Sequence, residues 1–331
     1  MSESNEAKKP QRPVLGLHHV TAIAGDPQQN VDFYAGVLGL RLVKKTVNFD
    51  DPGTYHLYFG DGDGNPGSIM TFFPWPGARQ GHAGRGQTRT TTFAVPQGSL
   101  DFWRHRLAIA GVEIEEGESF GEETLSFRDG DGLHLALVAN AAADDARRPW
   151  SGADIPADVA ILGFDAVSLQ VTHLEPTEAA PEAMGFRRVG SEGDRHRFEV
   201  GDGGSGTRVD VLVTPGAPPA RSGAGTVHHV AFRNVDDDSQ LEWQKFLGEA
   251  GLWPTDVKDR NYFHSIYFRE PGGVLFELAT DPPGFAIDEE ANALGEALKL
   301  PSWFESRRGQ IEKALPAITV PTALPKAGAL S

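Results

Sequence analysis

The chain has 331 residues, no cysteine and a formal net charge of −16, and its length suits about two domains. The absence of cysteine excludes disulfides, thiolate metal sites and a cysteine nucleophile, and the acidic charge argues against a nucleic-acid-binding protein. No apolar run is long enough for a membrane span and no secretory signal is visible, so we expect a cytoplasmic protein with no membrane contact.

Four similar units follow one another along the chain, over residues 15–76, 88–140, 160–215 and 225–281. Each is predicted to hold a strand, a helix and three further strands, with a glycine-rich turn before the last strand. The predicted helices end at a glycine that is followed by the apolar start of a strand, at Gly39, Gly111, Gly185 and Gly251. The repeat predicts an α+β protein made of four βαβββ modules.

The repeat also predicts the domain boundaries. Two modules would form a first domain and two a second, joined by a polar linker that contains proline and glycine. A polar, disordered lead-in would precede them, and a C-terminal helix over residues 301–315 with a proline-rich tail would follow. The predicted segments are 1–14 (lead-in), 15–140 (first domain), 141–159 (linker), 160–281 (second domain) and 282–331 (helix and tail).

Paired histidines begin the first and fourth units only, as His18-His19 and His228-His229. Successive side chains of a strand point to opposite faces, so one histidine of each pair can reach a shared site directly. We choose His19 and His229, which precede valine, and Thr21 then shares a face with His19. Units one and four are therefore expected to pack together, which leaves units two and three to pair with each other.

A carboxylate stands in the last strand of the fourth unit, four residues after Gly273. Glu277 lies between two apolar residues, where a charge is costly unless it is paired or binds a metal. With the two histidines it would form a 2-His-1-carboxylate triad, which leaves open positions on Fe(II). The matching positions of the other units hold Thr71, Ala136 and Asp210, and we interpret Asp210 as structural or solvent-facing because its unit has no histidine.

Polar residues near Glu277 are candidates for contact with a substrate. Arg260, His264 and Tyr267 are close to it in sequence, and Tyr267 is predicted on the strand that pairs with the Glu277 strand. A tyrosine hydroxyl or a guanidinium beside a metal can bind a phenolate or stabilise a developing negative charge. Aromatic residues in "MTFFPWPGA" are candidates for the wall of an apolar pocket.

These motifs resemble the vicinal oxygen chelate (glyoxalase/extradiol dioxygenase) superfamily, and more closely the ring-cleaving hydroquinone dioxygenases, the group that contains 2,6-dichlorohydroquinone 1,2-dioxygenase. The resemblance covers nearly the whole chain. It rests on the segment from "LHHVTAIAGDPQQNVDFYAG" to "GSIMTFFPWPGA" and on "HHVAF", "DRNYFHSIYFREPGGVLFELATDPPGF" and "LPSWFESRRGQIEKALP". It implies two domains of cupped mixed sheets.

The resemblance also implies a set of roles. Fe(II), with Mn(II) as an alternative, would be held by His19, His229 and Glu277. Residues with a catalytic role would be His228, Tyr267 and Arg260. His18 and Thr21 would surround the ligands or the substrate, and we add His264 to them from its position in the sequence.

The expected function is Fe(II)-dependent, extradiol-type cleavage of a hydroquinone-like aromatic ring with O₂ as co-substrate, in aromatic catabolism or quinone detoxification. Three alternatives stay open. A glyoxalase-type lyase needs a fourth protein ligand, and a catechol or hydroxyphenylpyruvate dioxygenase takes all three ligands from the C-terminal half. A non-catalytic binding protein would not need the triad. The expected partner is a small aromatic molecule, and a homo-oligomer is compatible with the sequence.

Overall fold

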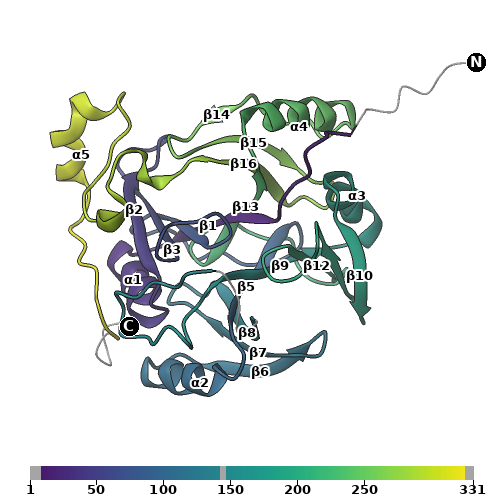
Figure 1. The fold of residues 1–331 in the computed structure, drawn as a ribbon, viewed down its shortest axis with the longest axis horizontal. Coiled ribbons are helices and arrows are strands. Elements are labelled where there is room, and N and C mark those ends of the chain that lie inside the picture. Colours follow the sequence, from purple (N-terminus) through teal and green to yellow (C-terminus); the bar gives the residue numbers. More distant parts are fainter. Residues whose placement is uncertain (1–8, 142–146, 325–331) are drawn as a thin grey trace, which may run out of the picture.

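The computed structural model describes residues 9–141 and 147–324 and contains two mixed β-sheets of eight strands each. Both sheets curl into cups, and the helices lie around them, with α4 beside the first sheet and α2 beside the second (Figure 1). The predicted α+β class with four βαβββ modules is confirmed.

The first sheet is built from modules one and four. Its two halves meet where β1 and β13 pair antiparallel, which confirms the expectation that units one and four pack together. In spatial order its strands are β14 (Lys258–Asp259), β15 (Phe263–Arg269), β16 (Leu275–Pro283), β13 (Thr226–Asn234), β1 (Leu17–Ala24), β4 (Ile69–Pro74), β3 (Tyr55–Gly60) and β2 (Arg41–Val47).

The second sheet is built from modules two and three, which meet where β5 and β9 pair antiparallel. Each sheet therefore takes one module from the N-terminal half of the chain and one from the C-terminal half. The predicted domain boundaries, 15–140 and 160–281, concern the chain order and stay a prediction. In spatial order its strands are β10 (Arg187–Glu192), β11 (Arg195–Glu199), β12 (Arg208–Val213), β9 (Gly163–Val171), β5 (Gln87–Pro96), β8 (His134–Ala141), β7 (Glu122–Arg128) and β6 (Ile114–Ser119).

Each module has one helix, and the four glycines predicted to end these helices all have positive φ angles, between 68° and 98°. Such angles favour glycine because it has no Cβ. No helix in the described ranges is both long and apolar enough to cross a membrane. The helices are α1 (Pro27–Val31) with a π-helical continuation (Asp32–Val37), α2 (Leu100–Ile109), α3 (Leu174–Met184), α4 (Asp237–Glu249), α5 (Arg308–Ala314) and short 3₁₀ turns at Phe285–Ile287, Ala291–Ala293 and Glu305–Arg307.

The segments outside the modules pack on the first sheet. Of the predicted lead-in, residues 1–8 lie outside the described residues, whereas Val14 is buried and the carbonyl of Arg12 accepts a hydrogen bond from Trp243 Nε1 (3.0 Å). The C-terminal segment runs beside β2 and α1 (Figure 1), where the Lys44 ammonium contacts Asp288 at 2.6 Å. The predicted C-terminal helix is shorter than expected and spans α5. Parts of the predicted linker (142–146) and tail (325–331) are outside the described residues.

The cup of the second sheet, defined by the inward residues of β7, β9, β11 and β12, holds an ion-pair network in place of a metal site. Asp210 is 2% exposed and accepts hydrogen bonds from Arg197 Nε (2.8 Å) and Nη2 (3.0 Å) and from Arg195 Nη1 (3.1 Å). Arg208 contacts Asp165 and Glu122, both at 3.0 Å. Of the two predicted interpretations of Asp210, the structure supports the structural one, because the side chain is buried and paired.

Replacing Arg197 by methionine is expected to lower the free energy of unfolding by about 3 kcal/mol, because the buried Asp210 carboxylate loses its bidentate partner. A double variant that also carries Asp210→Leu should recover part of this loss, since both charges are then removed. Urea denaturation of the three proteins measures both effects. A single variant as stable as the unmodified protein would contradict the expected role of the network.

The buried carboxyl of Asp129 gives a second, pH-dependent stability effect. Asp129 accepts hydrogen bonds from Leu133 N (2.8 Å), Asp131 N (3.0 Å) and Tyr34 Oη (2.9 Å), and burial raises its pKa to about 7. An aspartate in the unfolded chain has a pKa of about 3.9, so the folded state holds this proton more tightly. The protonated Asp129 carboxyl therefore makes its full contribution to the free energy of unfolding below about pH 4, and this contribution is lost as the pH rises through about 7.

An Asp129→Asn variant should lack this dependence. Between about pH 5 and about pH 8, the free energy of unfolding of the unmodified protein should fall by about 2 kcal/mol more than that of the variant. Denaturation curves of both proteins at the two pH values measure the difference, in which contributions of other groups cancel. Equal losses in the two proteins would contradict the raised pKa.

Candidate metal centre

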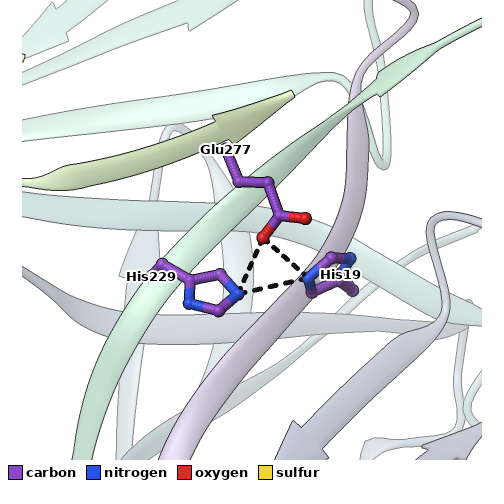
Figure 2. A group of neighbouring side chains, drawn as sticks. All are labelled: His19, His229 and Glu277. Atoms are coloured by element: carbon purple, nitrogen blue, oxygen red, sulfur yellow. Dashed lines mark hydrogen bonds and ion pairs between the residues drawn. The ribbon is translucent and has the colours of Figure 1, made fainter. Parts of the chain in front are cut away.

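Three donor side chains converge in the cup of the first sheet, from three adjacent strands. His19 on β1, His229 on β13 and Glu277 on β16 are 2%, 6% and 0% exposed. Glu277 Oε2 lies 2.9 Å from His229 Nε2 and 3.2 Å from His19 Nε2, and the two nitrogens are 3.2 Å apart. Figure 2 shows the carboxylate pointing between the two rings.

The donor atoms fit a divalent cation. Donors about 2.1 Å from one ion are about 3.0 Å apart on the face of an octahedron and about 3.4 Å apart in a tetrahedron, and the observed spacings of 2.9, 3.2 and 3.2 Å suit one shared ion. Glu277 Oε2 is buried and makes no hydrogen bond of good geometry within the described chain, although Oε1 accepts one from Ser265. An oxygen left in this state is free to bind a cation.

The ionisation state also suits a cation. Burial raises the pKa of Glu277, but the imidazoles of His19 and His229 outweigh burial and hold this pKa well below its usual range. Burial lowers the pKa of His229. A carboxylate and neutral imidazoles are the forms that bind metals.

Two β-bulges position the first histidine of each pair. Along the β1–β13 ladder, His18 is the extra residue of β1 and His228 the extra residue of β13. A bulge redirects the side chain of its extra residue, so these two rings are not held on the opposite face as in a regular strand. His18 Nδ1 lies 2.9 Å from His19 Nδ1, and His228 Nδ1 lies 2.8 Å from His229 Nδ1.

These contacts leave the Nε2 atoms of His19 and His229 available for a metal. Burial lowers the pKa of His18 and sets that of His228 at about 4, so both are neutral. His18 Nε2 lies 3.3 Å from the carbonyl of Thr280, which requires the proton on that nitrogen. His18 Nδ1 then accepts from His19 Nδ1–H, which fixes the tautomer with an unprotonated Nε2.

A cavity of about 460 Å³ opens above the triad. Arg260 Nε donates to Tyr267 Oη (3.1 Å), and burial and the charge of Glu277 raise the pKa of Tyr267, so that it remains protonated. Thr21 lines this cavity, and its buried Oγ1 has no hydrogen-bond partner among the described residues. The aromatic walls include Phe49, Tyr58, Phe73, Trp75 and Phe263. The cavity combines an apolar body with hydrogen-bond donors beside the triad, which suits a small aromatic molecule with hydroxyl groups.

Comparison with known proteins places the chain in a family. The sequence profile of the Glyoxalase/Bleomycin resistance protein/Dioxygenase superfamily matches residues 16–278. The chain belongs to this superfamily. MhqO of Bacillus subtilis strain 168, provisionally named a ring-cleaving dioxygenase, is 50% identical over 92% of this chain and 96% of its own. A chlorohydroquinone/hydroquinone 1,2-dioxygenase of Sphingobium indicum is 36% identical over 91% of this chain and 96% of its own.

Solved structures agree with this placement. The crystal structure of a dioxygenase, also provisionally named, from Bacillus subtilis has a TM-score of 0.88 at 48% identity, and covers 94% of this chain and 99% of that one. Glyoxalase I from Zea mays has a TM-score of 0.59 at 17% identity, over 80% of this chain and 92% of that one, which shows the fold alone. The resemblance drawn from the sequence motifs is confirmed, and within the superfamily the chain groups with ring-cleaving dioxygenases.

The structure places most, but not all, of the sequence-predicted residues at this superfamily site. His228, Arg260, Tyr267 and Thr21 line the cavity beside His19 and His229, while Glu277 lies at its base and His18 behind His19. The placement of His264 is corrected. Because side chains alternate along β15, His264 points away from the cup, and its Nδ1 lies 2.6 Å from Asp237 of α4.

Sequence reasoning missed His56 and Tyr58 of β3 and the loop residues Asn48 and Asp50, all of which line the cavity. His56 had a detectable signal. It is a histidine in the apolar strand "YHLYFG", two positions before a tyrosine, in the module that supplies His19. The loop residues carry no such signal, because their approach to the cavity depends on how the β2–β3 loop folds over the cup.

Proposed function

We propose that the chain is an Fe(II)-dependent, extradiol-type ring-cleaving dioxygenase that inserts O₂ into a hydroquinone-like aromatic. The observation that carries this proposal is the convergence of three donors, with Thr71 in the place of a fourth. Two histidines and one carboxylate with open positions are typical of non-haem Fe(II) oxygenases. The names of the relatives in Bacillus and Sphingobium support the same class of reaction.

Fe(II), with Mn(II) as the alternative, would be held by His19, His229 and Glu277. When bound, the ion would supply neighbouring open positions for a substrate oxygen and O₂, together with the redox chemistry that activates O₂. Zinc in a structural site is usually closed by four protein ligands, which this site does not offer.

The surrounding side chains would then bind the ring and manage protons. The imidazole of His228 lines the cavity and is neutral, so it is able to accept the proton of a phenolic hydroxyl. The neutral Tyr267 hydroxyl and the Arg260 guanidinium would donate hydrogen bonds to negatively charged oxygens. The aromatic walls would hold the ring and exclude water.

The alternatives are less well supported. A glyoxalase-type lyase shares the fold, but Thr71 offers no carboxylate as a fourth ligand. In a non-catalytic binding protein, nothing would require a buried carboxylate beside two imidazoles. We retain the expected cytoplasmic location and a small aromatic partner as predictions, with no nucleic-acid or membrane partner.

The proposal is tested by metal reconstitution. Protein freed of metal and reloaded anaerobically with Fe(II), Mn(II) or Zn(II) is mixed with hydroquinone, with catechol, or with the methylglyoxal–glutathione hemithioacetal, while O₂ uptake and thioester formation are recorded. We expect O₂ uptake with hydroquinone for the iron protein, with lower or no uptake for zinc. An iron-loaded protein that consumes no O₂ with any dihydroxybenzene, or one that isomerises the hemithioacetal, would overturn the proposal.

A further inference from the structure

The first module repeats the architecture around Glu277 with a different set of side chains. β1 and β13, which carry the histidines, each pair with a parallel strand. Thr71 of β4 pairs with Thr21, two residues after His19, and Glu277 of β16 pairs with Ala231, two residues after His229. Thr71 is thus the counterpart of Glu277 across the internal repeat, and it is likewise fully buried. A threonine is shorter than a glutamate, so it does not reach as far into the cup as the carboxylate of the other half.

The neighbouring strands repeat as well. Tyr58 pairs with Thr71 on β3–β4, as Tyr267 pairs with Glu277 on β15–β16. Two residues earlier on these strands, Ser265 donates a hydrogen bond to Glu277, and its counterpart His56 makes a short contact through Nε2 with Thr71 Oγ1. The His56 imidazole of β3 therefore lies next to the position where a longer, carboxylate side chain at residue 71 would lie.

His56 is fixed by its surroundings. Its Nδ1 lies 2.8 Å from Tyr58 Oη, and its ring packs on Tyr58 (4.0 Å between centroids) and Phe73 (4.4 Å). Burial lowers its pKa, as do the nearby imidazoles of His19 and His229. His56 is therefore a neutral ring with one N–H and two neighbours, and its hydrogen bonds must be ordered in one of two directions.

In one direction the hydrogen-bonded chain ends on a donor. If Tyr58 donates its hydroxyl proton to Nδ1, Nε2–H donates to Thr71 Oγ1, and the Thr71 hydroxyl proton remains free for a further acceptor. Among the described residues Thr71 has no other side-chain partner. The hydroxyl of Thr21, the register neighbour of Thr71, is buried and has no hydrogen-bond partner among the described residues. In this direction both hydroxyls, side by side on the cup, lack an acceptor, and a ligand oxygen between them and the triad would supply it.

We propose that Tyr58, His56 and Thr71 form a hydrogen-bonded chain that presents the Thr71 hydroxyl, together with that of Thr21, to a negatively charged phenolate oxygen of the substrate. In this scheme Thr71 touches the substrate and His56 is a positioning residue. The scheme deepens and rests on the proposed function, since it concerns the substrate oxygen at the same site. The scheme assigns recognition of the substrate oxygen to module one, which provides one metal ligand, His19.

The test uses 4-nitrophenol, whose absorbance distinguishes the phenol from the phenolate. Its dissociation constant is measured anaerobically on iron-loaded protein for the unmodified chain, Thr71→Val, His56→Phe and the double variant. Loss of a hydrogen bond to a charged oxygen should weaken phenolate binding about tenfold or more in each single variant. The double variant should be no weaker than Thr71→Val, because His56 acts through Thr71. His56→Gln, which keeps a donor, should recover part of the affinity.

Matched controls separate this scheme from a general loss of structure or of iron. Iron content should equal that of the unmodified protein in every variant, and His196→Ala, a histidine of the second sheet that contacts Ser191, should bind nitrophenolate normally. Full phenolate affinity in His56→Phe, additive losses in the double variant, or loss of iron would each overturn the scheme. If the unmodified protein binds nitrophenolate but cleaves no ring, the proposed function fails while the scheme stands. If the unmodified protein cleaves hydroquinone and the variants bind nitrophenolate normally, the scheme fails while the proposed function stands.

Discussion

Replacing Glu277 by alanine is expected to remove the metal and to lower ring cleavage by more than about a hundredfold. Even partners that only orient a metal ligand typically contribute about 10–100-fold to affinity or activity, so loss of a ligand should exceed that range. Glu277 is the single carboxylate of the triad and lies within 3.2 Å of both imidazole nitrogens. Metal content by atomic spectroscopy and O₂ uptake with hydroquinone measure the two effects.

The second sheet offers a matched control for this substitution. Asp210 occupies the equivalent strand position in module three and is equally buried, but it is paired with arginines. Asp210→Ala should therefore lower stability without changing the metal content. A Glu277→Ala protein that keeps both its metal and its activity would contradict the assignment of the triad.

Introducing a carboxylate at position 71 is expected to strengthen metal binding, whereas Glu277→Ala weakens it. Both substitutions are expected to lower ring cleavage. In Thr71→Glu the new side chain starts from the counterpart position of Glu277, so it should complete a four-ligand site. Affinity for divalent metals should rise, and ring cleavage should fall more than about a hundredfold, because the position for a substrate oxygen is filled. Chelator competition and O₂ uptake measure these two changes.

Stability provides a further readout of the Thr71→Glu protein. Without metal, a buried carboxylate has no cationic partner, so the apo variant should be less stable than the unmodified apo protein. Adding Zn(II) should reverse this difference, since binding to the folded state alone stabilises it. The isosteric control Thr71→Gln has a neutral, weaker donor and should show neither the gain in affinity nor the rescue. A Thr71→Glu protein with unchanged ring cleavage would show that position 71 does not face an open coordination position.

Much of the fold was predictable from the sequence because the repeat is local. The helix of each module ends at a residue with a left-handed backbone, which favours glycine. The sequence shows this glycine in every module, at Gly39, Gly111, Gly185 and Gly251. The pairing of modules one and four followed from chemistry, because His19 and Glu277 must reach one ion. Strand alternation left one histidine of each pair for the site, and the position before valine selected His19 and His229. Glu277 was selected as a charge in an apolar strand, and the structure brings the three together.

The parts that were not predictable depend on irregular backbone or on contacts between modules. The bulges at His18 and His228 violate the period of two, so alternation alone could not show that each ring contacts its neighbour. His264 was misplaced because closeness in sequence to Glu277 was given more weight than its face of β15. The role of His56 was hidden because its partner Thr71 lies on another strand and carries no charge.

The proposed function requires this cup to bring a ring hydroxyl and O₂ together on an ion held by three protein ligands. The most direct measurement is a single-turnover reaction of the iron-loaded protein with hydroquinone under ¹⁸O₂, with mass spectrometry of the product. We expect a ring-opened product that contains both labelled oxygen atoms, with one O₂ consumed for each ring. Formation of an intact quinone, or a product that contains no labelled oxygen, would contradict the claim.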